Sequence, residues 1–229
     1  MTEERVEGTF ELHVFVAPLD PPPEVIEAFT AACRSASVPT KALHLRLDYV
    51  HRGFVGVLQS SRYVTGDVEH AIRSIHEDAE MLRAAGLEVI REKVEALAAN
   101  EGVPKCATDA ERSPRDRYFE FHLLIDGDDH ALSEDDMVSL RGLSREFSER
   151  LRAPVPLSYN TMKPSQRFLN MRARGVGLDA ATAPVRELER AIAERGGLKV
   201  TKLISEYICF DTNRDVDNGW TEPLPAERG

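Results

Sequence analysis

The sequence is poor in cysteine and lacks long apolar runs, and both shortages limit what the chain can be. Its three cysteines, Cys33, Cys106 and Cys209, are odd in number and lack metal-type spacing, which predicts reduced thiols. No apolar run reaches the roughly 20 residues that a bilayer span requires, and the polar, acidic residues 1–7 do not resemble a secretory signal. We therefore expect a cytoplasmic protein with no membrane partner.

Several catalytic signatures and an excess of basic charge are also missing. No Gly-x-Ser-x-Gly, P-loop or zinc-knuckle spacing is present, and no cysteine lies in a nucleophile motif. The chain has 29 Lys and Arg against 39 Asp and Glu, a formal net charge of −10. Because general nucleic-acid affinity comes mainly from neutralised phosphates, this balance disfavours a nucleic-acid partner. It leaves room for a local basic pocket.

The strongest positive feature is a repeated segment. Residues 10–16 read FELHVFV, and residues 119–125 read FEFHLLI. Side chains of a strand alternate between its two faces, so each copy places a glutamate and a histidine on one face and apolar residues on the other. The polar pairs are Glu11 with His13 and Glu120 with His122. One face is predicted to pack on a core, and the other carries a carboxylate beside an imidazole.

Hydrophobic periodicity gives the same order of elements, β-α-β-β-α-β, in both halves of the chain. Strands are predicted at residues 10–16, 41–48, 53–59, 87–97, 118–126, 156–160, 167–174 and 198–210, and helices at 24–35, 67–85, 133–150 and 180–195. This order predicts an α+β fold, a tandem repeat of two ferredoxin-like lobes with antiparallel sheets. The lobes are residues 9–98 and 118–212, joined by a linker at 99–117 and followed by a tail at 213–229.

The duplicated Glu-x-His pairs are the first candidate site. A carboxylate and an imidazole on one strand face suit acid–base chemistry, with His13, His122, Glu11 and Glu120 as the catalytic candidates. Since the first and last strands of such a lobe are neighbours, Glu95 and Glu206 are expected near these pairs. His13, His122, Glu95 and Glu206 are then candidate ligands of a divalent metal. The alternative is a buried, hydrogen-bonded polar layer between the lobes.

A repeated bias towards basic residues is the second candidate site. In residues 30–66 the only acid is Asp48, and residues 150–178 contain none. Arginine suits carboxylate or phosphate, so these bands predict a small anion site. The candidate ligand-binding residues are Arg52, Arg62, Arg167, Arg172, Arg174 and Lys202. The alternative is that the arginines pair with the acid-rich helices.

Two further patterns favour structure over ligand binding. Residues 174–177, RGVG, precede a predicted helix and could offer backbone N–H groups to an anion, but ordinary turn glycines explain them better. Residues 211–222 place acids or amides at the positions of a calcium-binding loop. Val216 stands where that loop requires glycine, and Pro223 follows where a helix should begin. We therefore expect an ordered C-terminal turn held by Trp220.

Two lobes with one histidine each resemble, in plan, the two-histidine phosphoesterases, in which each lobe contributes a His-x-Thr/Ser motif to a shared cleft. Here Val14 and Phe15 follow His13, and Leu123 and Leu124 follow His122, so the motif's hydroxyl is absent and the resemblance covers lobe order and paired histidines only. The same plan occurs in tandem ferredoxin-like RNA-processing endonucleases, which the acidic balance disfavours.

The preferred hypothesis is a two-lobed protein that binds a small phosphorylated or carboxylated ligand on the polar sheet faces. As an enzyme it would be a His/Glu acid–base or metal-dependent hydrolase. The alternative is a non-catalytic interaction or scaffold protein whose sheet faces pair lobes or subunits, as in a homodimer. That alternative predicts buried histidines with no cavity beside them.

Overall fold

The computed structural model describes residues 5–49, 52–127 and 132–221. The last residue of the calcium-loop pattern, Glu222, and the rest of the predicted tail after it, residues 223–229, lie outside these residues. The strands are β1 (Glu7–Val16), β2 (Lys41–Tyr49), β3 (Gly53–Asp67), β4 (Val89–Leu97), β5 (Tyr118–Gly127), β6 (Leu157–Asn160), β7 (Arg167–Arg174) and β8 (Leu198–Asp211). The helices are α1 (Pro23–Ser35), α2 (Val68–Ala84), α3 (Ala107–Arg112), α4 (Glu134–Leu151) and α5 (Leu178–Glu194), followed by the short 3-10 helix η1 (Arg214–Asp217).

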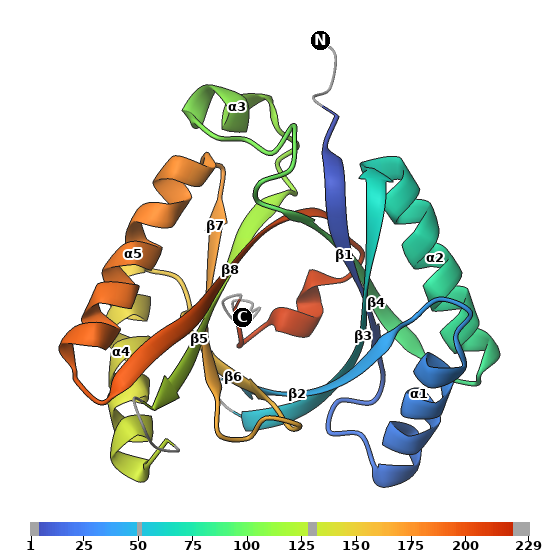
Figure 1. Cartoon of the computed structure of the whole chain (residues 1–229), viewed down its shortest axis with the longest axis horizontal. Helices are drawn as coiled ribbons and strands as arrows, with labels where there is room; N and C mark the ends of the chain where they lie inside the picture. Colours follow the sequence, from blue (N-terminus) through green and yellow to red (C-terminus); the bar gives the residue numbers. More distant parts are fainter. Residues whose placement is uncertain (1–4, 50–51, 128–131, 222–229) are drawn as a thin grey trace, which may run out of the picture.

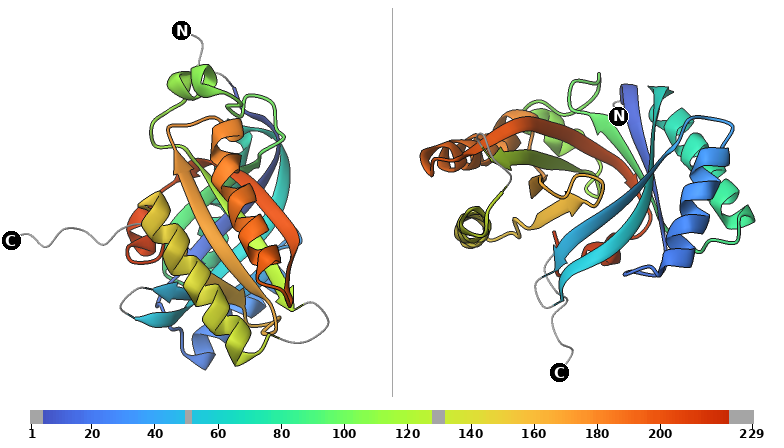
Figure 2. Two further views of the ribbon diagram at one scale, coloured as in Figure 1. Left: turned by 90° about the vertical axis from the view of Figure 1, so that its left-hand side faces the viewer. Right: turned by 60° about the horizontal axis from the view of Figure 1, so that its bottom comes forward.

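The strands form one closed antiparallel barrel in the order β1-β3-β2-β6-β7-β5-β8-β4. Helices α1 and α2 cover one side of the barrel and α4 and α5 cover the opposite side (Figure 1; Figure 2). The chain is therefore a mixed α+β protein with an antiparallel sheet, as the element order predicts. The predicted separate sheet in each half is not present, because β2 pairs with β6 and β4 pairs with β8 across the two halves.

Closure of the barrel gives the strand faces different surroundings. Phe10, Leu12 and Val14 of β1 point outward and belong to the main core, under the helices. Glu11, His13 and Phe15 line the barrel interior instead. The predicted division of the repeated segment into an apolar and a polar face is thus present in the structure. The polar faces of the two halves look into the same enclosed space.

Local sequence signals explain where the helices begin. The Asp67 side chain accepts a hydrogen bond from the His70 N–H at 2.7 Å and caps α2, as predicted for this acid. Ser133 and Asp136 form a reciprocal capping box at the start of α4. These caps satisfy N–H groups that the helices leave without internal partners.

The two halves repeat their pairing register as well as their element order. Phe15 lies opposite Arg91 in the β1/β4 pair, and the corresponding Leu124 lies opposite Lys202 in the β5/β8 pair. A register shift follows each of these positions, between Phe15 and Val16 and between Leu124 and Ile125. A register shift changes which face of the sheet the following residues occupy. Because the shift falls at the same position in both halves, corresponding residues of the two halves occupy corresponding faces.

Other elements differ from the prediction in length. Strand β3 continues to Asp67, well beyond the predicted end at residue 59, and the linker contains α3. The extra length of β3 arises because β1 pairs with it as far as Glu7 opposite Asp67. Within the described ranges, no helix is both long and apolar enough to cross a membrane.

Candidate functional site

His13 is held between two carboxylates inside the barrel. Its Nε2 lies 3.3 Å from Glu95 Oε2 and 3.7 Å from Glu11 Oε1, and its Nδ1 lies 2.8 Å from the Ser60 carbonyl. Burial alone would lower the pKa of His13, but Glu95, Glu11 and the Ser60 carbonyl outweigh it and raise the pKa to about 9. His13 is therefore an imidazolium at neutral pH and donates from both ring nitrogens.

His122 occupies the matching position in the second half with different partners. Its Nδ1 lies 2.7 Å from Asn170 Oδ1, and its Nε2 lies 3.5 Å from Glu206 Oε2 and 3.8 Å from Glu120 Oε2. The Asn170 amide nitrogen donates to the Pro156 carbonyl at 2.9 Å. Because this bond fixes the amide orientation, Asn170 offers an oxygen to His122, and Nδ1 of His122 must carry a hydrogen. The Nε2 atom is then the one that can exchange a proton.

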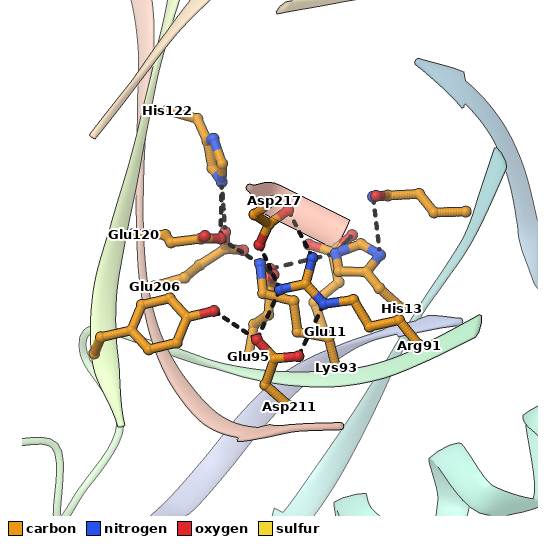
Figure 3. A network of polar contacts seen from close by, with 12 residues as sticks. Glu11, His13, Arg91, Lys93, Glu95, Glu120, His122, Glu206, Asp211 and Asp217 are labelled. Carbon is orange, nitrogen blue, oxygen red and sulfur yellow. Dashed lines mark hydrogen bonds and ion pairs between the residues drawn. The ribbon is translucent and has the colours of Figure 1, made fainter. Parts of the chain in front are cut away.

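Lys93 joins the two histidine sites. Its ammonium lies 2.6 Å from Glu95 Oε1 and also contacts Glu120 (Figure 3). Burial would raise the pKa of Glu95, but Lys93 and His13 hold it well below its usual range. Burial would likewise raise the pKa of Glu120, but Arg172 and Lys93 lower it to about 2. Both glutamates are carboxylates, and the two predicted Glu-x-His faces form one connected network.

Glu206 differs from the other buried glutamates. Burial, followed by the charges of Glu95 and Glu11, raises the pKa of Glu206 well above its usual range. Glu206 is therefore the carboxyl of this network that most favours its protonated form, and it hydrogen-bonds to Glu95. Its Oε2 lies 3.5 Å from His122 Nε2.

A second ion network closes one end of the barrel with the C-terminal segment, residues 211–220. The Arg91 guanidinium pairs with Asp211 at 2.7 Å and with Asp217 at 2.8 Å, and Asp217 also pairs with Arg172 at 2.6 Å. Burial would raise the pKa values of Asp211 and Asp217, but the arginines lower both. Trp220 packs beside them in an apolar cluster of Phe15, Leu47, Tyr49, Val55 and Val57. Figure 1 shows η1 lying within the outline of the barrel.

A cavity of about 410 Å³ occupies the rest of the barrel interior. Its floor is the histidine and glutamate network, and Trp220 lies at its closed end. The exposed lysines Lys41, Lys163 and Lys202 line the opposite end. The walls between floor and lysines are mainly apolar and include Leu43, Leu45, Leu124, Phe168 and Ile204. The volume is within the range of small-molecule sites, about 300–1,000 Å³.

The predicted anion-binding arginines do not come together in one place. Arg62 pairs with Asp78 of α2 at 2.7 Å, which is the helix pairing that the sequence analysis gave as the alternative. Arg167 lies over the Tyr159 ring, and Arg52 is exposed. Arg172 and Arg174 both lie over the Tyr118 ring, and Arg172 also pairs with Asp217 of the C-terminal segment. Of the six predicted residues, Lys202 alone lines the cavity.

The glycine-rich turn before α5 serves packing. Leu178 and Asp179 at the start of α5 donate their N–H groups to the Pro104 and Lys105 carbonyls at 2.9 and 3.1 Å. A Cβ on Gly177 would lie 2.5 Å from the backbone of Cys106, so glycine permits this close approach. The first N–H groups of the helix are therefore occupied by the linker.

Glu11, His13 and Glu95 could hold a metal ion, since each offers a ligand atom and these atoms all lie within 4.8 Å of one another. This set differs from the predicted one, because Glu11 joins it and His122 and Glu206 do not. A metal there would have to replace the proton on His13 Nε2 and share Glu95 with Lys93.

Lys93 and the ion pairs of Asp217 were not predicted from the sequence, whereas Lys41 and Lys163 lie within the two predicted basic bands but were not among the candidate ligand-binding residues. Arg91, Lys93 and Glu95 alternate along β4, and that period-two spacing would have placed Lys93 on the polar face with Glu95. Asp217 was read only as part of a loop pattern. Nothing in the local sequence indicates that its segment enters the barrel.

Comparison with known proteins finds slight structural similarities. No family model matches the sequence, and no curated protein matches it. The fold is similar to a "Putative monooxygenase" of Fusobacterium nucleatum subsp. nucleatum, with 10% identity over 98% of this chain and 100% of the other and a TM-score of 0.35. It is also similar to a "Putative Chlorite dismutase" (12% identity, 89% and 95% coverage, TM-score 0.30) and to a mutant chlorite dismutase from Candidatus Nitrospira defluvii (11% identity, 89% and 92% coverage, TM-score 0.32). At these scores we take no function from the neighbours.

Proposed function

We propose that the barrel binds a small anionic molecule in its interior cavity, and that His122 exchanges a proton with it. The observation that carries the proposal is the cavity of about 410 Å³, which has lysines at one end and a buried His/Glu floor. An enclosed, mainly apolar space with a few convergent polar groups is typical of a ligand site.

The three lysines support the anionic character of the ligand. Lys41, Lys163 and Lys202 form no ion pair within residues 5–49, 52–127 and 132–221, whereas the buried cations Arg91, Lys93 and Arg172 all have carboxylate partners. A ligand carboxylate or phosphate would supply the missing counter-charge. Charge-assisted hydrogen bonds to lysine are stronger than neutral ones.

The orientation of His122 supports the proton-exchange role. Asn170 fixes the hydrogen on Nδ1, so Nε2 faces Glu206 and the cavity. His13 is a weaker candidate because both of its ring nitrogens are already engaged with Glu95 and Ser60. The hydrolase function stays a prediction, since a proton donor and acceptor serve many reactions.

We also infer that the halves are copies of one ferredoxin-like lobe. The common order β-α-β-β-α-β, the matching pairs Phe15 with Arg91 and Leu124 with Lys202, and the register shift after each support this origin. The scaffold alternative predicted no cavity beside the histidines. His13 and His122 both line the cavity, which favours ligand binding.

A thermal-unfolding screen of the full chain tests the binding proposal. The panel contains sugar phosphates, nucleotides, dicarboxylates and divalent metals. A ligand at a hundred times its Kd adds about 2.7 kcal/mol to the free energy of unfolding, a midpoint shift of roughly 5–10 °C for a chain of this size. The shift should disappear when Lys41, Lys163 and Lys202 are all changed to methionine. It should persist in Lys105→Met, which removes a lysine that does not line the cavity. Absence of any shift would favour the scaffold alternative.

Nitrogen NMR of the histidine rings tests the orientation of His122. The wild-type protein should show hydrogen on Nδ1 of His122. Asn170→Leu removes the acceptor, so this preference should weaken in the variant, while the His13 signals stay unchanged because Ser60 still accepts from His13. A wild-type ring with hydrogen on Nε2 alone would contradict the proposed role.

A divalent metal at Glu11, His13 and Glu95 is the second candidate function, and the compact arrangement of their ligand atoms supports it. Calorimetric titration of the apo protein with Zn²⁺ or Mn²⁺ tests it. One bound metal per chain, with affinity that rises with pH and is lost in Glu11→Gln, would support this candidate. Equal affinity in Glu11→Gln would exclude the site.

A further inference from the structure

The closed end of the barrel contains a carboxylate and an indole supplied by the chain itself. Asp217 pairs with Arg91 and Arg172, and Trp220 is buried in the apolar cluster next to Phe15. The indole Nε1 also donates to the Leu157 carbonyl at 3.4 Å. This end of the barrel is therefore built to hold an acidic, aromatic group, and the C-terminal segment is its occupant.

The open end is formed by the residues of the second half that correspond to those at the closed end. Arg91 and Phe15 are paired at the closed end, and Lys202 and Leu124 are the corresponding pair at the other. Both pairs line the interior, and in both the first residue is a cation and the second is apolar. Lys41 and Lys163 add charge at the open end, and Phe168 adds an aromatic wall.

The linker explains why, among the residues that the structure describes, the open end has no occupant of the same kind. Asn100 follows Glu95 by the same interval as Asp211 follows Glu206, so the two residues begin matching segments. The Asn100 side chain donates to the Thr9 carbonyl at 2.7 Å and accepts from the Thr9 N–H at 3.1 Å. A Cβ on Gly8 would lie 2.5 Å from Asn100 Oδ1, so glycine allows this docking. These bonds direct the linker along β1 toward α3, whereas Asp211 leads the C-terminal segment onto Arg91.

We propose that the open end binds a small aromatic carboxylate, and that the C-terminal segment at the closed end is an internal model of this ligand. The inference rests on the proposed anion-binding function and makes its ligand class specific. The carboxylate contacts Lys202 together with Lys41 or Lys163, and the ring packs between Leu43, Leu124 and Phe168. The ring edge then approaches His122, which lies 6.5 Å from the Phe168 ring centre.

Calorimetry on the full chain with matched small molecules tests this class. The probes are indole-3-acetate, the neutral indole-3-ethanol, the non-aromatic hexanoate and inorganic phosphate. We expect indole-3-acetate to bind about tenfold or more tightly than each of the others, because each control loses either a charge-assisted bond or the buried ring. Comparing the four affinities separates the contribution of the ligand's charge from that of its aromatic ring.

Two lysine variants locate the binding. Lys202→Met removes the charge and keeps most of the apolar stem, and should weaken indole-3-acetate by about tenfold. Lys105→Met is the matched control at a lysine outside the cavity and should bind as the wild type does. Circular dichroism melting of both variants checks that the fold is retained. Equal binding by Lys202→Met and the wild type would overturn the assignment of the open end.

The outcomes distinguish the two proposals. Hexanoate or phosphate binding as tightly as indole-3-acetate, with the loss in Lys202→Met, would overturn the aromatic class and leave the anion-binding function standing. If indole-3-ethanol bound as tightly as indole-3-acetate, the proposed carboxylate contact with the lysines would be wrong. No binding by any probe, together with no shift across the thermal screen, would overturn both proposals.

Discussion

The two ends of the barrel are built from matching strands, yet one is closed by paired charges and the other keeps three lysines beside a cavity. At the closed end Arg91 is 1% exposed and pairs with Asp211 and Asp217. At the open end the corresponding Lys202 is exposed and lines the cavity. Matching strand pairs, β1/β4 and β5/β8, therefore carry a buried, paired cation at one end and an exposed lysine beside the cavity at the other.

The segment that follows the last strand of each half determines whether that end of the barrel is closed. After β8 the chain turns inward through η1, and Asp211, at the end of β8, and Asp217, in η1, neutralise the buried cations. After β4 the chain is held on β1 by Asn100. A buried cation requires paired anions, because an uncompensated buried charge costs several kcal/mol.

The largest expected effect is the loss of Arg91. Arg91→Met leaves Asp211 and Asp217 buried without their main counter-charge, so the free energy of unfolding should fall by about 3–5 kcal/mol. Urea denaturation measures the difference. Lys202→Met is the control at the matching position and should change the free energy of unfolding by less than about 0.5 kcal/mol. Similar losses in the two variants would show that the ends are equivalent in stability.

The next effect concerns Trp220. Trp220→Ala should lower the free energy of unfolding by about 3 kcal/mol, since it removes a large side chain that is 8% exposed within an apolar cluster. Trp220 is the chain's single tryptophan, so its fluorescence in the wild type reports on the closed end directly. We expect blue-shifted emission that resists quenching by iodide. Met162→Ala, at a side chain that is 80% exposed, is the matched control and should have little effect. Emission typical of an exposed indole would contradict the burial of Trp220 at the closed end.

A smaller effect is the pH dependence contributed by His13. Its pKa of about 9 in the folded chain is above the unfolded value near 6.5. The resulting stabilisation, roughly 3 kcal/mol, is fully present below pH 6.5 and is lost as the pH rises through about 9. Denaturation in metal-free buffer between pH 6.5 and 10 measures this slope. In His13→Gln the contribution should vanish, and an unchanged slope in that variant would assign the dependence to other groups.

The smallest effect is expected at His122. The side chain of His122 is 22% exposed and makes its shortest bond to Asn170. His122→Phe should therefore lower the free energy of unfolding by only about 1 kcal/mol. His13→Phe should cost more, because it removes the cation between Glu11 and Glu95. Equal costs would mean that the two halves differ less than their contacts indicate.

Much of the fold could be predicted because it depends on short-range patterns. The alternation in FELHVFV and FEFHLLI set the polar and apolar faces, and Asp67 and Ser133 marked the starts of two helices. The approach of Glu95 and Glu206 to the histidines followed from the neighbouring positions of first and last strands in each half. The predicted cluster of anion-binding arginines did not form. Arg62 pairs with Asp78 on the far side of the sheet, and arginine composition alone cannot tell which face a partner occupies.

The sequence by itself determined the order of elements, the two faces of the repeated strand and the Glu-x-His pairs, since these depend on residues close in the chain. Only the tertiary structure decided that β2 meets β6 and β4 meets β8, which closes one barrel and brings His13 and His122 to one cavity. It also decided that Asp217 and Trp220 enter that barrel. Contacts between segments more than a hundred residues apart depend on which backbone edges and buried charges remain unpaired after local folding, and no local pattern records that choice.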